Sequence, residues 1–152
     1  MNIADLVDIR NINLNVSVSC KDDLFNVMAE QLEKTGFIKN KRKFVKDLYK
    51  REKEASTGIE EGFAIPHAKS KQVLRPTIAI SKTTSIKDYK TFDGSPVQWV
   101  FMLAVPENNS SVHLEILSYL ARKLMDENFK KNIKSATTEQ QVLDFLSNEE
   151  VI

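Results

Sequence analysis

The alternation of apolar and polar residues divides the chain into segments with a recognisable period. In residues 11–18 every second side chain is apolar, which predicts a strand with one covered face. Between Ser19 and Gly36 the apolar residues recur about every 3.6 positions, so we expect a helix that Ser19 caps and Gly36 ends. A second helix is predicted from a cap at Asn40 to about Glu54. The residues expected to face the core in these two helices are Leu24, Phe25, Val27, Met28, Leu32, Phe44, Val45 and Leu48.

The second half of the chain begins with strands and ends with helices. Residues 77–81 form a compact strand candidate, and Asp93-Gly94 indicates a turn. The nearly continuous apolar run 97–105 predicts a central strand that is covered on both faces. A polar loop then leads into three helices, of which Asp126 caps the second and Thr137 or Thr138 caps the third, followed by a frayed tail from Ser147. The inward positions are expected at Leu114, Leu117, Leu120, Ala121, Leu124, Phe129, Ile133, Val142, Leu143, Phe145 and Leu146.

Composition narrows the range of partners and compartments. The length of 152 residues suits one domain, 1–152, and the order of strands and helices suits a layered α/β fold. The 22 basic and 21 acidic residues leave a net charge of +1, which gives no reason to expect nucleic acid or an anionic membrane as a partner. The longest apolar run is too short for membrane insertion, and Asp5 and Asp8 interrupt any signal-peptide pattern. The single cysteine, Cys20, excludes an internal disulfide and fits the cytoplasm.

The segment 51–70 carries the candidate chemistry. A basic helical stretch ends in a loop with Gly58 and Gly62, and a short apolar run then leads to Pro66 and His67. Proline lacks an N–H and cannot pair in a strand interior. We therefore expect the chain to leave the sheet at Pro66, with His67 at the end of a strand. Open α/β sheets place their binding sites at such strand ends.

The same segment resembles a known active-site signature. The stretches Arg51-Glu52, Ser56-Thr57-Gly58-Ile59 and Gly62-Phe63-Ala64-Ile65-Pro66-His67 are similar to those of the fructose/mannitol family of phosphotransferase-system enzyme IIA domains. Glu60 stands where the family commonly has glycine, and Phe63 where an aliphatic residue is usual. The resemblance covers the whole chain and implies one domain, with a mixed β-sheet of about five strands flanked by helices on both faces.

The resemblance also implies a function. The chain would accept phosphate from phospho-HPr on His67 and pass it to a cysteine of a sugar-specific IIB component, of the fructose type, which works with a membrane IIC component. His113 would be a neighbour that contacts the phosphate and orients the site. Neither a cofactor nor a metal is implied.

The residue types suit phosphoryl transfer independently of the resemblance. Neutral imidazole attacks through a lone pair, and the phosphoimidazole that results is a good donor. Arg51 can bracket phosphate oxygens with its planar fork, and the backbone of Thr57 and Gly58 can aim N–H groups at an anion. His113 falls near a predicted helix start, where the local positive charge should keep its ring neutral.

Other interpretations stay open at this stage. The chain could be a nitrogen-type regulatory IIA protein that signals through the phosphorylation state of His67 without sugar transport. A hydrolytic metal enzyme would need three or more ligands, and no third ligand accompanies the two histidines. We interpret Cys20 as structural and the lysine-rich run 39–53 as a solvated helix face rather than a docking patch.

Overall fold

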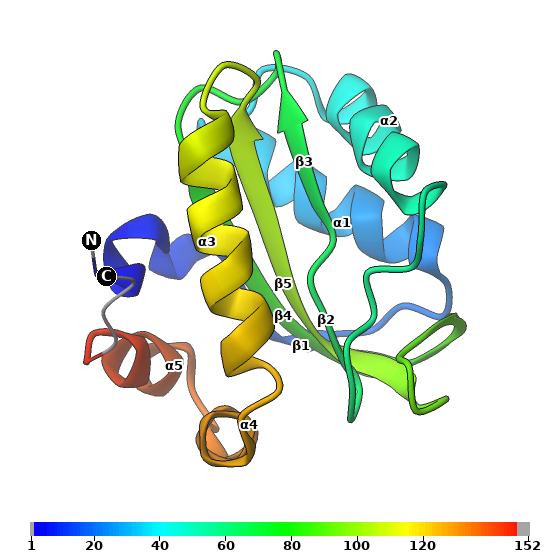
Figure 1. Cartoon of the computed structure of the whole chain (residues 1–152), viewed down its shortest axis with the longest axis vertical. Coiled ribbons are helices and arrows are strands. Elements are labelled where there is room, and N and C mark those ends of the chain that lie inside the picture. Colours follow the sequence, from blue (N-terminus) through cyan, green and yellow to red (C-terminus); the bar gives the residue numbers. More distant parts are fainter. Residues whose placement is uncertain (1, 149–152) are drawn as a thin grey trace.

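The computed structural model describes residues 2–148 and has a mixed five-stranded open sheet with helices on both faces (Figure 1). This confirms the fold class that the sequence predicts. The elements follow in this order: η1 (Ile3–Leu6), η2 (Ile9–Asn11), β1 (Ile12–Val16), α1 (Lys21–Lys34), α2 (Lys41–Glu52), β2 (Phe63–Ala64), β3 (His67–Ser70), β4 (Thr77–Lys90), β5 (Pro96–Pro106), α3 (Ser110–Lys123), α4 (Glu127–Ser135) and α5 (Glu139–Leu146).

The sheet has the order β1-β4-β5-β2, and β3 also pairs with β5, farther along that strand. β4 and β5 are antiparallel, whereas β1 is parallel to β4, and β2 and β3 are parallel to β5. β5 is therefore paired on both sides. Every residue from Val97 to Val105 except Gln98 is buried, which confirms the prediction of a central strand covered on both faces.

The alternation of side chains along β5 supplies two hydrophobic cores. Phe101 and Leu103 pack in the core that includes residues of α3, α4 and α5. Val100 and Met102 pack in the core that includes residues of α1 and α2. The sheet is thus a middle layer between two groups of helices, and β3 at its edge lies between α2 and α3 in Figure 1.

Most helix ends lie where the sequence predicts. Asn40 and Asp126 cap α2 and α4 by accepting backbone N–H groups at 2.9 and 3.1 Å. Thr138, the second of the two candidates, caps α5. The cap of α1 is Cys20 rather than Ser19, because the helix begins one residue later and the Cys20 sulfur accepts the third backbone N–H at 3.5 Å. Cys20 therefore has the structural role that we expected.

The inward faces of two helices differ from the prediction. Leu114 is 64% exposed and Val27 is 40% exposed, although both were expected in the core. In α3 the buried positions are His113, Ile116, Tyr119 and Leu120, so Leu120 is inward as predicted and His113 takes the place expected for Leu114. The helix thus turns a histidine, not a leucine, toward the sheet edge.

The strand predictions need two corrections. The strand expected at 77–81 continues to Lys90, because its second half pairs with the start of β5 across the predicted turn, where Gly94 has a φ of 82°. The chain also does not leave the sheet at Pro66. The carbonyl of Pro66 accepts from the Leu103 N–H at 3.0 Å, and β3 then continues the pairing with β5. A proline is tolerated here because β2 and β3 form an edge, where one row of N–H groups needs no partner. Of the tail expected to fray from Ser147, residues 149–152 lie outside the described part.

Candidate active site

His67 is the first residue of β3 and is 6% exposed. Its Nδ1 lies 2.8 Å from the carbonyl oxygen of Ile65. A carbonyl oxygen can only accept, so Nδ1 carries the hydrogen and Nε2 keeps the lone pair of the neutral ring. Pro66 biases Ile65 toward extended backbone, which helps to hold this carbonyl under the ring. The local fold therefore favours the tautomer in which the lone pair of the neutral ring is on Nε2.

His113, the fourth residue of α3, meets His67 across the sheet edge. The ring centroids are 5.3 Å apart and the ring planes are inclined by 44°. The Nδ1 atom of His113 is buried and has no hydrogen-bond partner among residues 2–148. Buried polar atoms without partners are rare in folded proteins and often mark a place where a ligand completes the bonding. The two predicted histidines are thus adjacent, and one of them has an unused hydrogen-bonding atom.

Burial lowers the pKa of both histidines. For His67 the loss of solvation is the largest cause, the Ile65 carbonyl acts in the opposite direction, and the positive charge of Arg51 lowers the pKa further. For His113 burial, followed by the charges of His67, Lys69 and Arg51, lowers the pKa to about 4. Both rings are therefore neutral near pH 7, the state in which an imidazole can act as a nucleophile.

An open cavity of about 1060 Å³ adjoins the two rings. It is lined by residues of α2, β3 and α3, including His67, His113 and Arg51. Arg51 lies in the last turn of α2, and its Nη1 donates to the carbonyl of Ala55 at 2.9 Å. The structure thus brings three of the predicted site residues to one cavity, where the positive charge of Arg51 acts on both histidines.

Thr57 and Gly58, which we expected to bind phosphate, do not line this cavity. The Thr57 hydroxyl bonds to the Glu52 carboxylate and the Tyr89 hydroxyl, and the Thr57 carbonyl accepts from the Ile65 N–H at 3.0 Å. A Cβ on Gly58 would lie 2.3 Å from the carbonyl oxygen of Lys90, so only glycine fits against β4 there. These contacts hold the residues that position His67, and a direct contact of Thr57 or Gly58 with phosphate stays a prediction.

Lys69 is a site residue that the sequence reasoning missed. It lies two residues after His67 in β3, so both side chains project to the same face of the strand. Its Nζ donates to the Ser110 hydroxyl of α3 at 3.2 Å, and its charge contributes to the low pKa of His113. The signal would have been the strand period, which we did not apply because we expected the strand to end at Pro66.

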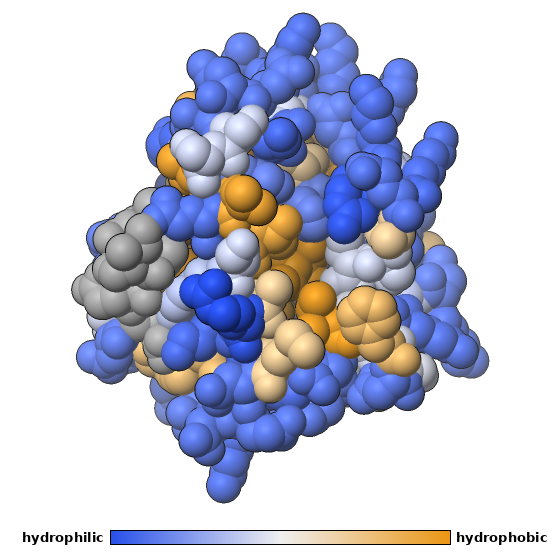
Figure 2. Space-filling view, in the orientation of Figure 1, coloured by the Kyte–Doolittle hydropathy of each residue, from blue (hydrophilic) through white to orange (hydrophobic). Residues whose placement is uncertain are grey.

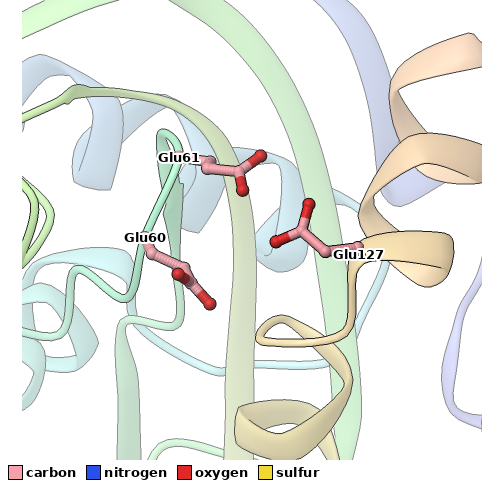
Figure 3. Close-up of side chains that lie close together, drawn as sticks. All are labelled: Glu60, Glu61 and Glu127. Atoms are coloured by element: carbon pink, nitrogen blue, oxygen red, sulfur yellow. The ribbon is translucent and has the colours of Figure 1, made fainter.

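A second charged cluster surrounds Lys130 of α4. This ammonium group is 1% exposed and lies 3.3, 3.0 and 3.1 Å from carboxylate oxygens of Glu60, Glu61 and Glu127. Figure 3 shows that two of the carboxylates come from the loop before β2 and the third from α4. Lys134 also contacts Glu61, at 3.2 Å. We call these five residues the Lys130 cluster.

The three glutamates of the Lys130 cluster are the one group among residues 2–148 with enough nearby acidic or histidine side chains to suggest a metal ion. The ammonium of Lys130 already occupies the space among their oxygens and neutralises part of their charge. The cluster therefore connects the active-site loop to α4. Glu60, which departs from the usual signature, belongs to this contact and not to the histidine cavity.

Comparison with known proteins identifies the family of this chain. Residues 5–149 match the protein family described as "Phosphoenolpyruvate-dependent sugar phosphotransferase system, EIIA 2". The chain belongs to this EIIA family. Within residues 2–148, none of the helices combines the length and apolar character needed to cross a bilayer.

The EIIA relatives of the chain include proteins with transport names and proteins with regulatory names. The chain is 35% identical to the "PTS system fructose-specific EIIABC component" of Bacillus subtilis, with 97% of this chain aligned to 23% of that protein. It is 30% identical to the "PTS system fructose-specific EIIA component" of Haloferax volcanii, over 95% of this chain and 94% of that protein. The crystal structure of the nitrogen regulatory protein IIA-Ntr from Neisseria meningitidis superposes with a TM-score of 0.85 at 30% identity, covering 95% and 98% of the two chains. The chain is thus similar to both transport and regulatory members.

Proposed function

We propose that this EIIA chain is a phosphohistidine carrier that accepts a phosphoryl group from phospho-HPr on Nε2 of His67. The observation that carries the proposal is the hydrogen bond from His67 Nδ1 to the Ile65 carbonyl. It fixes a neutral tautomer whose lone pair is on the other nitrogen of a ring that lines an open cavity.

The transfer needs no cofactor. The Nε2 lone pair of His67 forms a bond to phosphorus while the bond from phosphorus to the donor imidazole breaks, and the bonding electrons return to the donor ring. The proton on His67 Nδ1 stays in place, and the Ile65 carbonyl stabilises the positive charge that develops on the ring. In the second half-reaction a cysteine thiolate of a IIB component attacks the same phosphorus, and His67 leaves as neutral imidazole.

Positioning and charge neutralisation do most of the work in phosphoryl transfer. Arg51 lines the cavity and can bind phosphate oxygens with its planar guanidinium. The buried Nδ1 atom of His113 has no partner among residues 2–148, so its ring can adopt the tautomer that donates a hydrogen bond to a phosphate on His67. The 5.3 Å between the ring centroids suits a contact of this kind.

The partners follow from the family. The name of the Bacillus subtilis relative joins the A, B and C components in one protein, which supports a IIB acceptor with a membrane IIC component. Two fructose-specific relatives favour a fructose-type IIB. We place this activity in the cytoplasm, where such carriers meet HPr.

A regulatory role is the second candidate, because the crystal structure that we compared is of a nitrogen regulatory IIA protein. In that case His67 would be phosphorylated in the same way, but the output would be binding to another protein. A IIB component from the same genome separates the two roles. Rapid discharge of phospho-His67 to its cysteine supports transport, whereas retention of the phosphate supports regulation.

The test of the proposed function is phosphate loading. The chain is incubated with phosphoenolpyruvate, enzyme I and HPr, and the product is analysed by mass spectrometry under alkaline conditions that preserve phosphohistidine. We expect one acid-labile phosphate on His67 and none on the His67→Ala variant. Equal labelling of the variant would show that another residue is the acceptor.

A further inference from the structure

A row of exposed lysines borders the histidine cavity. Four of them lie on α2 or at its C-terminal cap, with spacings of three, four and three residues that place them on one stripe of the helix. Two more extend from the β3 side, and all six are exposed. We call these residues the basic rim: Lys43, Lys46, Lys50, Lys53, Lys69 and Lys71.

The basic rim concentrates positive charge at the active site. Its six lysines and Arg51 face three cavity carboxylates, those of Asp47, Glu54 and Glu107, which gives a net formal charge of +4. The whole chain has a net charge of only +1, so the rest of the molecule is negative by three charges. The charge distribution is therefore polarised toward the opening through which His67 is reached.

The basic rim is not explained by stabilising contacts. Among residues 2–148 none of its lysines takes part in an ion pair, whereas Lys21, Lys41 and Lys130 elsewhere are paired with glutamates. Like charges three or four residues apart destabilise a helix. The first turn of α2 also contains no acidic residue, although helix N-termini favour negative charge. The sequence alone suggested a solvated helix face. That interpretation does not explain why lysines are placed next to one another and at the helix N-terminus, where they destabilise the helix.

The middle of the same surface is apolar. Leu114 is 64% exposed, and it lines the cavity together with the half-buried Leu117. Figure 2 shows hydrophobic residues gathered near the centre of this face, with hydrophilic side chains around them. Protein interfaces commonly have an apolar centre and a polar rim.

We propose that the basic rim is a docking surface for a protein whose own phosphate-carrying residue is surrounded by carboxylates. The inference rests on the proposed function, because a partner that exchanges phosphate with His67 has to approach through this opening. Complementary charges bring such a partner to the site faster and in the productive orientation. The exposed leucine then packs against the partner at the centre of the contact.

The phosphoryl group changes the strength of this attraction. A phosphate adds about −1.5 to −2 charges at neutral pH, which offsets nearly half of the local +4. The free form of the chain therefore attracts an acidic partner more strongly than the phosphorylated form does. Loading should depend on salt more steeply than discharge when both partners are acidic.

The test uses rapid-quench measurement of phosphate transfer from phospho-HPr and to the IIB component of the same genome. The variant K46E/K50E/K53E reverses three charges of the basic rim, and K87E/K90E/K131E reverses three exposed lysines that do not line the cavity. We expect the first variant to lower the second-order rate constant with at least one partner about 10- to 100-fold at low salt. The wild-type rate with that partner should fall about tenfold between roughly 50 and 250 mM KCl. The control variant should stay within about threefold of wild type.

Chemical loading with potassium phosphoramidate, a small phosphoryl donor, separates docking from catalysis. The rim variant should still be phosphorylated on His67 by this reagent, which shows that the nucleophile is intact. If wild type is not phosphorylated on His67 by either route, the proposed function itself is wrong. If wild type is loaded but both triple variants behave alike with both partners, the docking proposal is wrong. Loss of binding to a duplex DNA fragment with unchanged partner rates would assign the rim to nucleic acid and also overturn it.

Discussion

The Lys130 cluster and the basic rim are two concentrations of charge that use their lysines in opposite ways. In the first, one buried ammonium lies within 3.3 Å of three carboxylates. In the second, six exposed lysines have no ion pair within residues 2–148 and lie beside two neutral histidines. The segment from Glu60 to Ser70 connects the two regions. Paired charges can stabilise the fold, whereas unpaired ones stay available for a ligand or a partner.

Arg51→Ala removes the guanidinium group from the histidine cavity and should have the largest effect. We expect single-turnover transfer from phospho-HPr to slow about 10²- to 10³-fold, the usual loss when one charge-stabilising donor is removed. Lys50→Ala is the matched control, because it removes a neighbouring cation of the basic rim. Circular dichroism should show that both variants remain folded. Equal rates for the two variants would mean that Arg51 acts only as one more rim charge.

Lys130→Met tests whether the Lys130 cluster stabilises the fold. Burial alone would lower the pKa of Lys130, but its hydrogen bonds to Glu61, Glu127 and Glu60 outweigh that effect and raise it. Removal of the ammonium leaves three carboxylates facing one another, so we expect the free energy of unfolding to fall by about 2 kcal/mol. Urea titration measures this loss, with Lys131→Met, an exposed neighbour, as the control. Phosphate loading at His67 should be nearly unchanged. A loss of loading without a loss of stability would contradict the division between the two regions.

The sequence predicted those features of the fold and the site that depend on residues close together in the chain. The signature around His67, the caps at Asn40 and Asp126, and the buried pattern of β5 are each contained in a few consecutive residues. The strand β3 was missed because its existence depends on pairing with Leu103 and its neighbours, more than thirty positions away.

The charged regions could not be separated from the sequence alone. Lys130 and Glu61 are 69 positions apart, so nothing local shows that they are paired. The sequence around the α2 lysines does not show whether a carboxylate lies beside them in the folded chain. The exposure of Leu114 follows from His113 taking the buried position in α3, which the pattern of apolar residues in the sequence does not predict.

His113 tests whether the unpaired polar atom at the cavity serves the phosphate. His113→Ala should still be loaded at His67, but discharge to a IIB component should slow about tenfold, the equivalent of one lost hydrogen bond. His113→Gln should recover part of the rate, because its amide can donate in place of the ring. Rapid-quench measurement of both half-reactions gives the comparison. If both variants match wild type, His113 only borders the site.

The pH dependence of stability offers a smaller effect. The pKa of His113 is about 4 in the folded chain and about 6.5 when unfolded, so the unfolded chain binds an extra proton between these values. The free energy of unfolding should therefore decrease as the pH falls through this window. We expect the free energy of unfolding of His113→Gln to fall by about 2 kcal/mol less than that of wild type between about pH 7 and 5. Parallel urea titrations measure the difference, and identical losses would show that the ring is not buried in its neutral form.

The most direct test of the central claim is the identity of the phosphorylated atom. Protein labelled with ¹⁵N-histidine is loaded from phosphoenolpyruvate, enzyme I and HPr, and its ring nitrogens are assigned by NMR through their coupling to ³¹P. The hydrogen bond from His67 Nδ1 to Ile65 predicts that phosphate appears on Nε2 of His67, with the Nδ1 proton retained. Phosphate on Nδ1 of His67, or on either nitrogen of His113, would contradict the account.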